Sequence, residues 1–411
     1  MPGYLPLVTK DIANPDWQVA ENYSLPTSPR HGSVIPVTAA ELAALNNLGA
    51  PESTLGPGLY ADPTIAAYCG KYYIYATTDG FPGWGGQEFY VWSSDNLVDW
   101  TRSDEPFLTL NGTDGNVPWA VGNAWAPTIA EKDGQYYFYF SGQNPTYEHK
   151  TIGVAVASSP EGPFAAEPTA MITNTESITS GQAIDPAVYK DPADGKYYIF
   201  WGNGESSLEG ARYAELNDDM VSIKNGSIAI IEDLQDFREG PWLIYREPYY
   251  HMTYAIDDTR SEDYRVGYAT SQSVHGPWEY RGVILQKQPS LGILATGHSS
   301  TVNVPGTDDW YIAYHRFNIP GGNGTEREVV VDPLFFNEET GLIEEVNPSW
   351  NGVQIPQTYE PDCSASGGAP GHDGGEGNGK GKGKGKGKGK GRGKGESKGK
   401  GKWKGNGNGY D

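Results

Sequence analysis

The sequence predicts an all-β protein folded as a five-bladed β-propeller, and two observations lead to this prediction. Of the 411 residues, 55 are Gly, 30 are Pro and 12% are aromatic, which is typical of many short strands joined by turns. One pattern, a turn residue, two aromatic residues and an alternating apolar stretch, also occurs five times at spacings of 52 to 64 residues. The copies read GKYYIYAT (70–77), GQYYFYFSG (134–142), GKYYIFWG (195–202), REPYYHMTYA (246–255) and DDWYIAYHR (308–316). A β-sandwich is the alternative, but it gives no reason for five aromatic hairpins at this interval.

Three regions of the chain differ in composition. Residues 1–55 are predicted to form an N-terminal extension that packs on the propeller, with a short helix over 38–49 indicated by a capping box and a final glycine. Residues 56–362 are predicted to form the propeller domain. Residues 363–411 are rich in Gly and Lys, cannot build an apolar core, and are predicted to be a disordered tail. A solvated linker is the simpler interpretation of this tail, and binding to an anionic cell-wall polymer is the alternative.

Charge is divided unevenly along the chain. The whole sequence has 52 acidic and 30 basic residues, a net charge of −22, yet the tail after residue 362 holds 12 of the basic residues and only four of the acidic ones. The remainder is therefore strongly acidic and is expected to repel nucleic acid. No run of 18 apolar residues codes for a membrane span. We expect a monomer that binds neither nucleic acid nor membrane.

Four glycosylation sequons favour a secreted, extracellular protein whose leader is absent from this sequence. They begin at Asn22, Asn111, Asn225 and Asn323. Chance alone would place about two, so a cytosolic protein with accidental sequons is the alternative. Cys69 and Cys363 could form a disulfide that joins the first blade to the segment after the last blade, and two separate thiols are the alternative.

Polar residues recur at the start of the strand that precedes each aromatic copy. These segments read YADPTIA (60–66), WAPTIA (125–130), AIDPAVY (183–189), REGPWLI (238–244) and GHSSTVN (297–303). Counting back ten or twelve residues from the first aromatic residue of each pair gives five equivalent positions. They hold Asp62, Ala126, Asp185, Glu239 and His298. Because the first strands of a propeller line its axis, we expect these side chains to gather at one mouth.

Three gathered carboxylates indicate acid–base chemistry. Neighbouring carboxylates repel one another, so their pKa values must spread apart, which supplies one acid and one base. A single acidic residue at a strand start would more simply cap a turn, but three at matching positions favour a shared site. No serine triad, phosphate-binding loop or zinc motif competes with it.

As a set, the segments ADPT, AIDPAV, REGPWLI and GHSS resemble glycoside hydrolase family 43, whose members are inverting hydrolases with a five-bladed propeller. The match covers roughly residues 55–350. The resemblance implies that Asp62 is the general base that activates water and that Glu239 is the general acid that protonates the leaving oxygen. It also implies that Asp185 tunes the pKa of the acid and orients it.

Two further residues are assigned by the same resemblance. His298 is similar to the axial histidine of the family, which implies a possible structural calcium or other ion on the propeller axis, and no other cofactor is required. Arg327 resembles the arginine that contacts the sugar or the tuning aspartate. The alternatives are a core histidine hydrogen-bonded to the two serines that follow it, and an arginine paired with a flanking glutamate.

Aromatic residues near the mouth could stack on sugar rings. Trp125 precedes the second of the five equivalent positions, and Trp84 lies in the Gly-rich segment FPGWGGQ (81–87). We expect both to contact substrate, while most other tryptophans pack between blades.

The resemblance implies cleavage of α-L-arabinofuranosyl or β-D-xylosyl bonds in arabinan, arabinoxylan and their oligosaccharides, and some members of the family act on galactan. The run GTDDWYIAYHRFNIPGGNGTEREVVVDPL (306–334) is most similar to exo-acting α-L-arabinofuranosidases that trim α-1,5-arabinan. A β-xylosidase or an endo-arabinanase of the same family, and a non-catalytic sugar-binding propeller, are the alternatives. A retaining invertase-like propeller would carry a WMNDPN-like segment, which the sequence lacks.

Overall fold

The computed structural model of the chain describes residues 7–8, 18–19, 53–175, 181–204 and 210–361. The chain divides into two units, Met1–Asp373, which holds every described residue, and Gly374–Asp411. In the described ranges the only helical segments are three single 3-10 turns, Pro82–Trp84, Gly112–Asp114 and Pro289–Leu291, and none could span a membrane. The helix expected over 38–49, Cys363 and the Gly-Lys tail lie outside the described residues.

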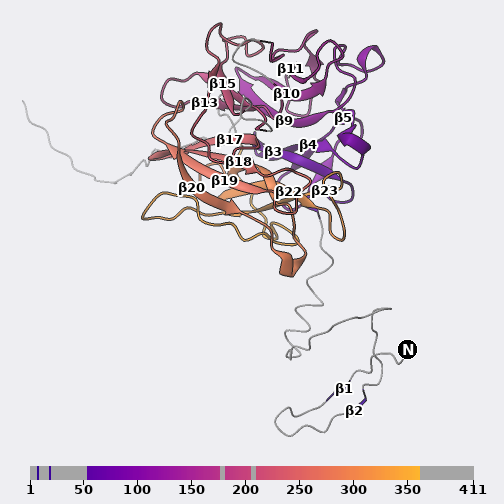
Figure 1. Cartoon of the computed structure of the whole chain (residues 1–411), viewed down its shortest axis with the longest axis vertical. Helices are drawn as coiled ribbons and strands as arrows, with labels where there is room; N and C mark the ends of the chain where they lie inside the picture. The colour runs from indigo at the N-terminus through magenta and orange to yellow at the C-terminus, as the bar shows by residue number, and fades with distance from the viewer. Residues whose placement is uncertain (1–6, 9–17, 20–52, 176–180, 205–209, 362–411) are drawn as a thin grey trace, which may run out of the picture. The chain divides into compact units, whose positions relative to one another are not determined.

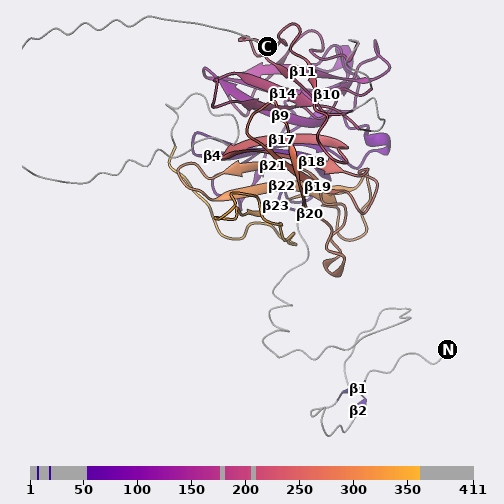
Figure 2. The same cartoon turned by 60° about the vertical axis from the view of Figure 1, so that its left-hand side comes forward.

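Five antiparallel sheets confirm the predicted five-bladed propeller (Figures 1 and 2). The first blade holds β3 (Tyr60–Tyr68), β4 (Lys71–Thr78), β6 (Val91–Ser94) and β7 (Thr101–Arg102). The second holds β9 (Trp125–Lys132), β10 (Gln135–Gln143), β11 (Lys150–Ala157) and β12 (Ala165–Ala166). The third holds β13 (Ala187–Lys190), β14 (Tyr197–Trp201), β15 (Arg212–Glu215) and β16 (Ala229–Ile230).

The last two blades follow the same order. The fourth holds β17 (Glu239–Arg246), β18 (Tyr249–Ile256), β19 (Arg265–Ser271) and β20 (Glu279–Leu285). The fifth holds β21 (Gly297–Asn303), β22 (Trp310–Phe317) and β23 (Arg327–Leu334). Two small ribbons, β1 (Leu7–Val8) with β2 (Gln18–Val19) and β5 (Glu88–Phe89) with β8 (Leu108–Thr109), complete the strands.

The repeated aromatic segments are the second strands of the blades, and their rings fill the space between neighbouring blades. Tyr75 of β4 packs against Phe138 of β10 with ring centroids 5.5 Å apart, and Phe107 meets Phe138 edge to face at 4.9 Å. Such pairs contribute about 0.5–1.5 kcal/mol beyond their area burial. The aromatic repeat is therefore the packing unit of the propeller.

Residues from both ends of the propeller region close the fifth blade. The backbone N–H of Thr54 donates to Val329 of β23, and the N–H of Val353 donates to Val331 on the same strand. Leu55 and Val353 share one buried cluster with strands of the first and fifth blades. This contact joins the last blade to the first and leaves the first strands β3, β9, β13, β17 and β21 in a closed ring of neighbours.

Candidate active site

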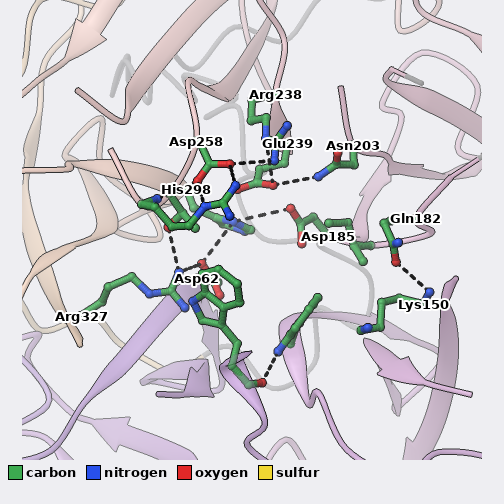
Figure 3. Close-up of a pocket in the computed structure, with 15 residues that line it drawn as sticks. Asp62, Lys150, Gln182, Asp185, Asn203, Arg238, Glu239, Asp258, His298 and Arg327 are labelled. Atoms are coloured by element: carbon green, nitrogen blue, oxygen red, sulfur yellow. Dashed lines mark hydrogen bonds and ion pairs between the residues drawn. The ribbon is translucent and has the colours of Figure 1, made fainter. Parts of the chain in front are cut away.

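A pocket lies at the starts of the first strands, where the ring of blades converges (Figure 3). Its volume is about 260 Å³, which suits a ligand smaller than the drug-sized molecules that fill pockets of about 300–1,000 Å³. All seven site residues expected from the sequence line it, and so do eight others. The lining residues are Asp62, Trp84, Trp125, Lys150, Gln182, Ile184, Asp185, Asn203, Arg238, Glu239, Asp258, Thr259, Arg260, His298 and Arg327.

A left-handed backbone residue marks the start of each first strand. These residues are Asp62 (φ 52°), Ala126 (φ 38°), Asp185 (φ 59°), Gly240 (φ 60°) and His298 (φ 47°). The expectation that Glu239 is the fourth equivalent residue is therefore wrong by one position. The β17–β18 turn is Glu247-Pro248, so Tyr250, not Tyr249, matches the first aromatic residue of the other hairpins.

Because of this offset, Glu239 enters the pocket from a different backbone position than Asp62 and Asp185 do. Asp62 and Asp185 project from the strained residue itself, whereas Glu239 projects from the extended residue before it and uses a longer side chain. Glycine is favoured next to Glu239, because Gly240 has a left-handed φ and a Cβ there would lie 3.0 Å from Nδ1 of His298. The backbone N–H of Gly240 also donates to Oδ2 of Asp185 at 3.1 Å, which ties the third blade to the fourth.

Asp62 is surrounded by groups that favour its ionised form. Burial opposes the charge, but the guanidinium of Arg327, with Nη1 3.0 Å from Oδ1, and the nearby His298 and His315 hold the pKa of Asp62 well below its usual range. The hydroxyl of Thr77 donates to Oδ2 at 2.7 Å. Asp62 is therefore a fixed carboxylate that can accept a proton from water.

Arg327 contacts Asp62 rather than the tuning aspartate Asp185, which corrects one of the two contacts expected for it. Its Nε donates to Oδ2 of Asp79 at 2.7 Å, so two carboxylates hold the guanidinium. Neither flanking glutamate pairs with it: Glu328 binds Arg316 and Glu326 accepts from Asn323. Arg327 is thus part of the pocket wall and not a surface ion pair.

Glu239 lies in the opposite electrostatic environment. Burial raises its pKa to about 7, helped by the charges of Asp62 and Asp258 and opposed by Arg238 and by the hydroxyl of Tyr264. Its Oε1 accepts from Tyr264 at 2.9 Å, and Oε2 accepts from Nδ2 of Asn203 at 3.0 Å. Below neutral pH, Glu239 is a protonated acid facing the same pocket as an ionised carboxylate.

Asp185 is the third carboxyl that lines the pocket. Burial raises the pKa of Asp185 well above its usual range, and the charges of Glu239 and Asp62 add to this effect. Its Oδ2 lies 3.8 Å from Nδ1 of His298, and Oδ1 of Asp62 lies 3.4 Å from the same nitrogen. Asp185 is therefore electrostatically linked to both Glu239 and Asp62.

His298 faces Asp62 and Asp185 instead of the serines after it, whose hydroxyls bind Thr253 and Pro63. Burial lowers the pKa of His298, which favours its neutral imidazole. Among the described residues, no three His, Cys, Asp or Glu side chains group as metal ligands. An ion held by His298 on the propeller axis would need water to complete its coordination shell.

The two tryptophans form one side of the pocket. The indole N–H of Trp125 donates to the carbonyl of Trp84 at 2.6 Å, and the rings pack edge to face with centroids 6.4 Å apart. Nζ of Lys150 lies 4.9 Å from the centroid of the Trp125 ring and donates to Gln143. These contacts fix an aromatic wall beside the carboxyls.

Sequence reasoning missed several residues of the site. Asp258 lies between β18 and β19 and accepts from Arg238 and Arg260. Asn203 and Tyr264 bind Glu239 from other loops. Two of the missed residues could have been found from their place in the sequence: Arg238 is adjacent to Glu239, and His315 lies inside the fifth aromatic copy. The others lie in loops, which do not share the repeat.

Comparison with known proteins agrees with this geometry. A family profile described as "Glycosyl hydrolases family 43" matches residues 53–340, and one described as "Probable glycosyl hydrolase domain" matches residues 1–43. A Beta-D-galactofuranosidase of Aspergillus niger is 32% identical over 72% of this chain and 85% of its own length. A Xylosidase/arabinosidase of Bacteroides ovatus is 30% identical over 70% of this chain and 96% of its own length.

A solved structure shares both fold and sequence. It is a beta-xylosidase/alpha-arabinofuranosidase from a compost microbial metagenome in complex with xylotriose. Its TM-score is 0.61 at 28% identity, over 72% of this chain and 97% of that one. The family profile covers well over half of the chain, and three acidic residues, Asp62, Asp185 and Glu239, line one pocket of the propeller. The protein therefore belongs to glycosyl hydrolases family 43.

Proposed function

We propose that this glycoside hydrolase is an inverting exo-α-L-arabinofuranosidase that releases L-arabinose from α-1,5-arabinan, arabinoxylan or their oligosaccharides. One observation carries the proposal: two carboxyls with opposite protonation, Asp62 and Glu239, face one pocket. A hydrolase that inverts in one displacement needs this pair, an ionised base for water and a protonated acid for the leaving oxygen.

The roles follow from the two environments. Asp62 takes a proton from a water molecule, which attacks the anomeric carbon. Glu239 gives its proton to the glycosidic oxygen as the bond to the sugar breaks. Asp185, held by the Gly240 N–H, orients the acid and tunes its pKa through the repulsion between the two carboxyls. Afterwards Asp62 is protonated and Glu239 is ionised, and exchange with solvent restores both.

Loops close the pocket on the side of Asp62, which supports exo action. The indole N–H of Trp84 donates to the carbonyl of Gly324 at 2.6 Å, and the N–H of Gly80 donates to Thr325 at 2.8 Å. A Cβ on Gly324 would lie 2.9 Å from the Cα of Arg260, so a third loop packs against the second. These loop contacts favour a pocket that accepts a chain end over a groove through which a polysaccharide runs.

The names of two related proteins suggest xylosides and galactofuranosides as other substrates. The Bacteroides ovatus relative is named for xylosidase and arabinosidase activity, and the Aspergillus niger relative for galactofuranosidase activity. A β-D-galactofuranosyl residue has the ring configuration of α-L-arabinofuranose with one more hydroxymethyl group, so it is a second candidate for the same pocket. A β-xylosidase, an endo-arabinanase and a non-catalytic sugar-binding propeller are the remaining outcomes of the test.

Product analysis tests the proposal. The purified protein is incubated separately with linear α-1,5-arabinan, xylo-oligosaccharides and a β-D-galactofuranoside, and fresh anomers are followed by proton NMR. Free arabinose that appears first as the β-anomer is the expected result. Xylose, galactose or arabino-oligosaccharides as the main product would overturn the substrate assignment, a retained α-anomer would overturn inversion, and binding without any product would overturn catalysis.

A further inference from the structure

A tyrosine and a histidine that do not line the pocket lie directly beneath its carboxyls. Tyr264 comes from the residues between β18 and β19, is fully buried, and donates its hydroxyl to Oε1 of Glu239 at 2.9 Å. Burial, with the charges of Glu239, Asp62 and Asp185, raises the pKa of Tyr264 well above its usual range. The hydroxyl therefore stays protonated and remains a donor.

The ring of Tyr264 connects the acid to the base through His315. The two rings stack nearly parallel, with centroids 5.4 Å apart and an interplanar angle of 9°. His315 is fully buried, and its Nδ1 lies 3.2 Å from the backbone nitrogen of Asp62 and 3.1 Å from Oδ1 of the same residue. In either neutral tautomer Nδ1 can bind Asp62, accepting from the amide or donating to the carboxylate.

Glycine makes room for this stack. A Cβ on Gly297 would lie 2.2 Å from Cδ1 of Tyr264, closer than any side chain tolerates. Gly297 pairs with His315 across β21 and β22, so the missing side chain opens space beside the histidine for the tyrosine ring. The strands of the fifth blade are thus shaped to admit a ring from a loop of the fourth.

We propose that Tyr264 and His315 form a positioning unit that fixes the acid Glu239 relative to the base Asp62. The inference rests on the proposed function. In inverting hydrolysis a water molecule must fit between the acid–base pair, at a carboxyl separation of about 6.5–9.5 Å, and small displacements cost large factors in rate. The two carboxyls belong to different blades, and this stack, buried in the protein interior, joins them through contacts that exclude solvent.

The unit also acts on both ionisation states, together with the other groups that face each carboxyl. Tyr264 stabilises the ionised form of Glu239, and His315 stabilises the ionised form of Asp62. The other groups that face Glu239 are Arg238, Asn203, Asp62, Asp185 and Asp258. The other groups that face Asp62 are Thr77, His298, Arg327 and Asp185.

Tyr264→Phe tests the acid side, because it keeps the ring and removes only the donor. Loss of a hydrogen bond to a charged group should move the basic limb of the kcat profile up by about one pH unit and lower kcat about tenfold, with KM little changed. Tyr139→Phe is the matched control, since Tyr139 is equally buried and its hydroxyl binds the carbonyl of Met220 away from the pocket. A Tyr264→Phe profile identical to that of the control would overturn the proposal.

His315→Asn tests the base side, because an asparagine amide can replace Nδ1 but cannot stack on Tyr264. His315→Asn should lower kcat several-fold. His315→Phe removes Nδ1 as well, so it should move the acidic limb of the kcat–pH profile to higher pH. His315→Asn should move that limb by less. The double variant Tyr264→Phe/His315→Asn should lose less than the two single losses multiplied, because both break one unit. Fully multiplicative losses would show two separate contacts and would overturn the unit.

Gly297→Ala is a second route to the same answer, since it displaces the Tyr264 ring without changing any residue that lines the pocket. Its kcat should fall at least as far as that of Tyr264→Phe, and wild-type turnover would contradict the stack. If it does not fold, Tyr264→Phe decides alone. Inactive Glu239→Gln with an unaffected Tyr264→Phe would overturn this inference only, whereas active Glu239→Gln would overturn the proposed function.

Discussion

The two sides of the pocket contain the same kind of group and treat it in opposite ways. On one side, Asp62 lies against the guanidinium of Arg327 and accepts from Thr77, and its pKa is depressed. On the other, burial raises the pKa of Glu239 to about 7, and Asp258, which accepts from Arg238, adds to this effect while the arginine opposes it. The comparison shows that burial raises the pKa of a carboxyl in this pocket unless a close counter-charge outweighs it, whatever the residue type.

Removing either carboxylate should have the largest effect and should separate the two sides. Glu239→Gln and Asp62→Asn are each expected to lower kcat on natural oligosaccharides at least ~10³-fold. An aryl glycoside with a good leaving group needs little acid assistance, so it should restore much of the activity of Glu239→Gln and none of Asp62→Asn. Steady-state kinetics on both substrates checks this, and equal rescue of both variants would contradict the assignment.

Removing Arg327 should give Asp62 a raised pKa, as Glu239 has. Arg327→Met leaves Asp62 buried without its main counter-charge, so the pKa of Asp62 should rise and the acidic limb should move up by at least about one unit. We expect a fall in kcat of roughly 10²-fold below neutral pH. Arg316→Met is the matched control, because Arg316 is also fully buried and paired with Glu328 but does not line the pocket. An unchanged acidic limb would show that Arg327 is only structural.

The pH dependence of the unmodified enzyme measures both sides together. Activity should fall tenfold per unit as pH rises above about 7, because Glu239 loses the proton it must donate. It should also fall as pH drops through the depressed pKa of Asp62, because the base becomes protonated. A kcat/KM profile in buffers of constant ionic strength would reveal this bell, and a profile that stays flat through pH 7 to 9 would contradict the role of Glu239.

A smaller change should sharpen the acid side. Asp258→Asn removes a negative charge that raises the pKa of Glu239 and frees Arg238 to stabilise the ionised form. The basic limb should therefore move down, with about threefold to tenfold lower activity at pH 7 and near-normal activity at pH 5. An upward shift of that limb would contradict this account. Arg260, which also binds Asp258 but is largely exposed, provides the control variant Arg260→Gln, for which a smaller effect is expected.

The amino-acid sequence by itself determined the architecture and the central carboxylates. The five aromatic segments became the second strands of five blades, because alternating buried rings specify strand, face and spacing in one pattern. Asp62, Asp185 and His298 could be found because they stand next to those repeats. Glu239 was also found, but its register was wrong by one residue, since the turn before Tyr249 differs from the others.

Tertiary structure alone decided what each carboxylate can do. Asp79, Asn203, Asp258 and Tyr264 lie in segments with no shared pattern, and they contact residues that line the pocket only because the ring of blades closes. Local sequence specifies backbone conformation and which face is apolar, whereas a pKa depends on burial and on charges brought from distant blades. For this reason the presence of an acid and a base could be read from the chain, but the depressed pKa of Asp62 and the raised pKa of Glu239 could not.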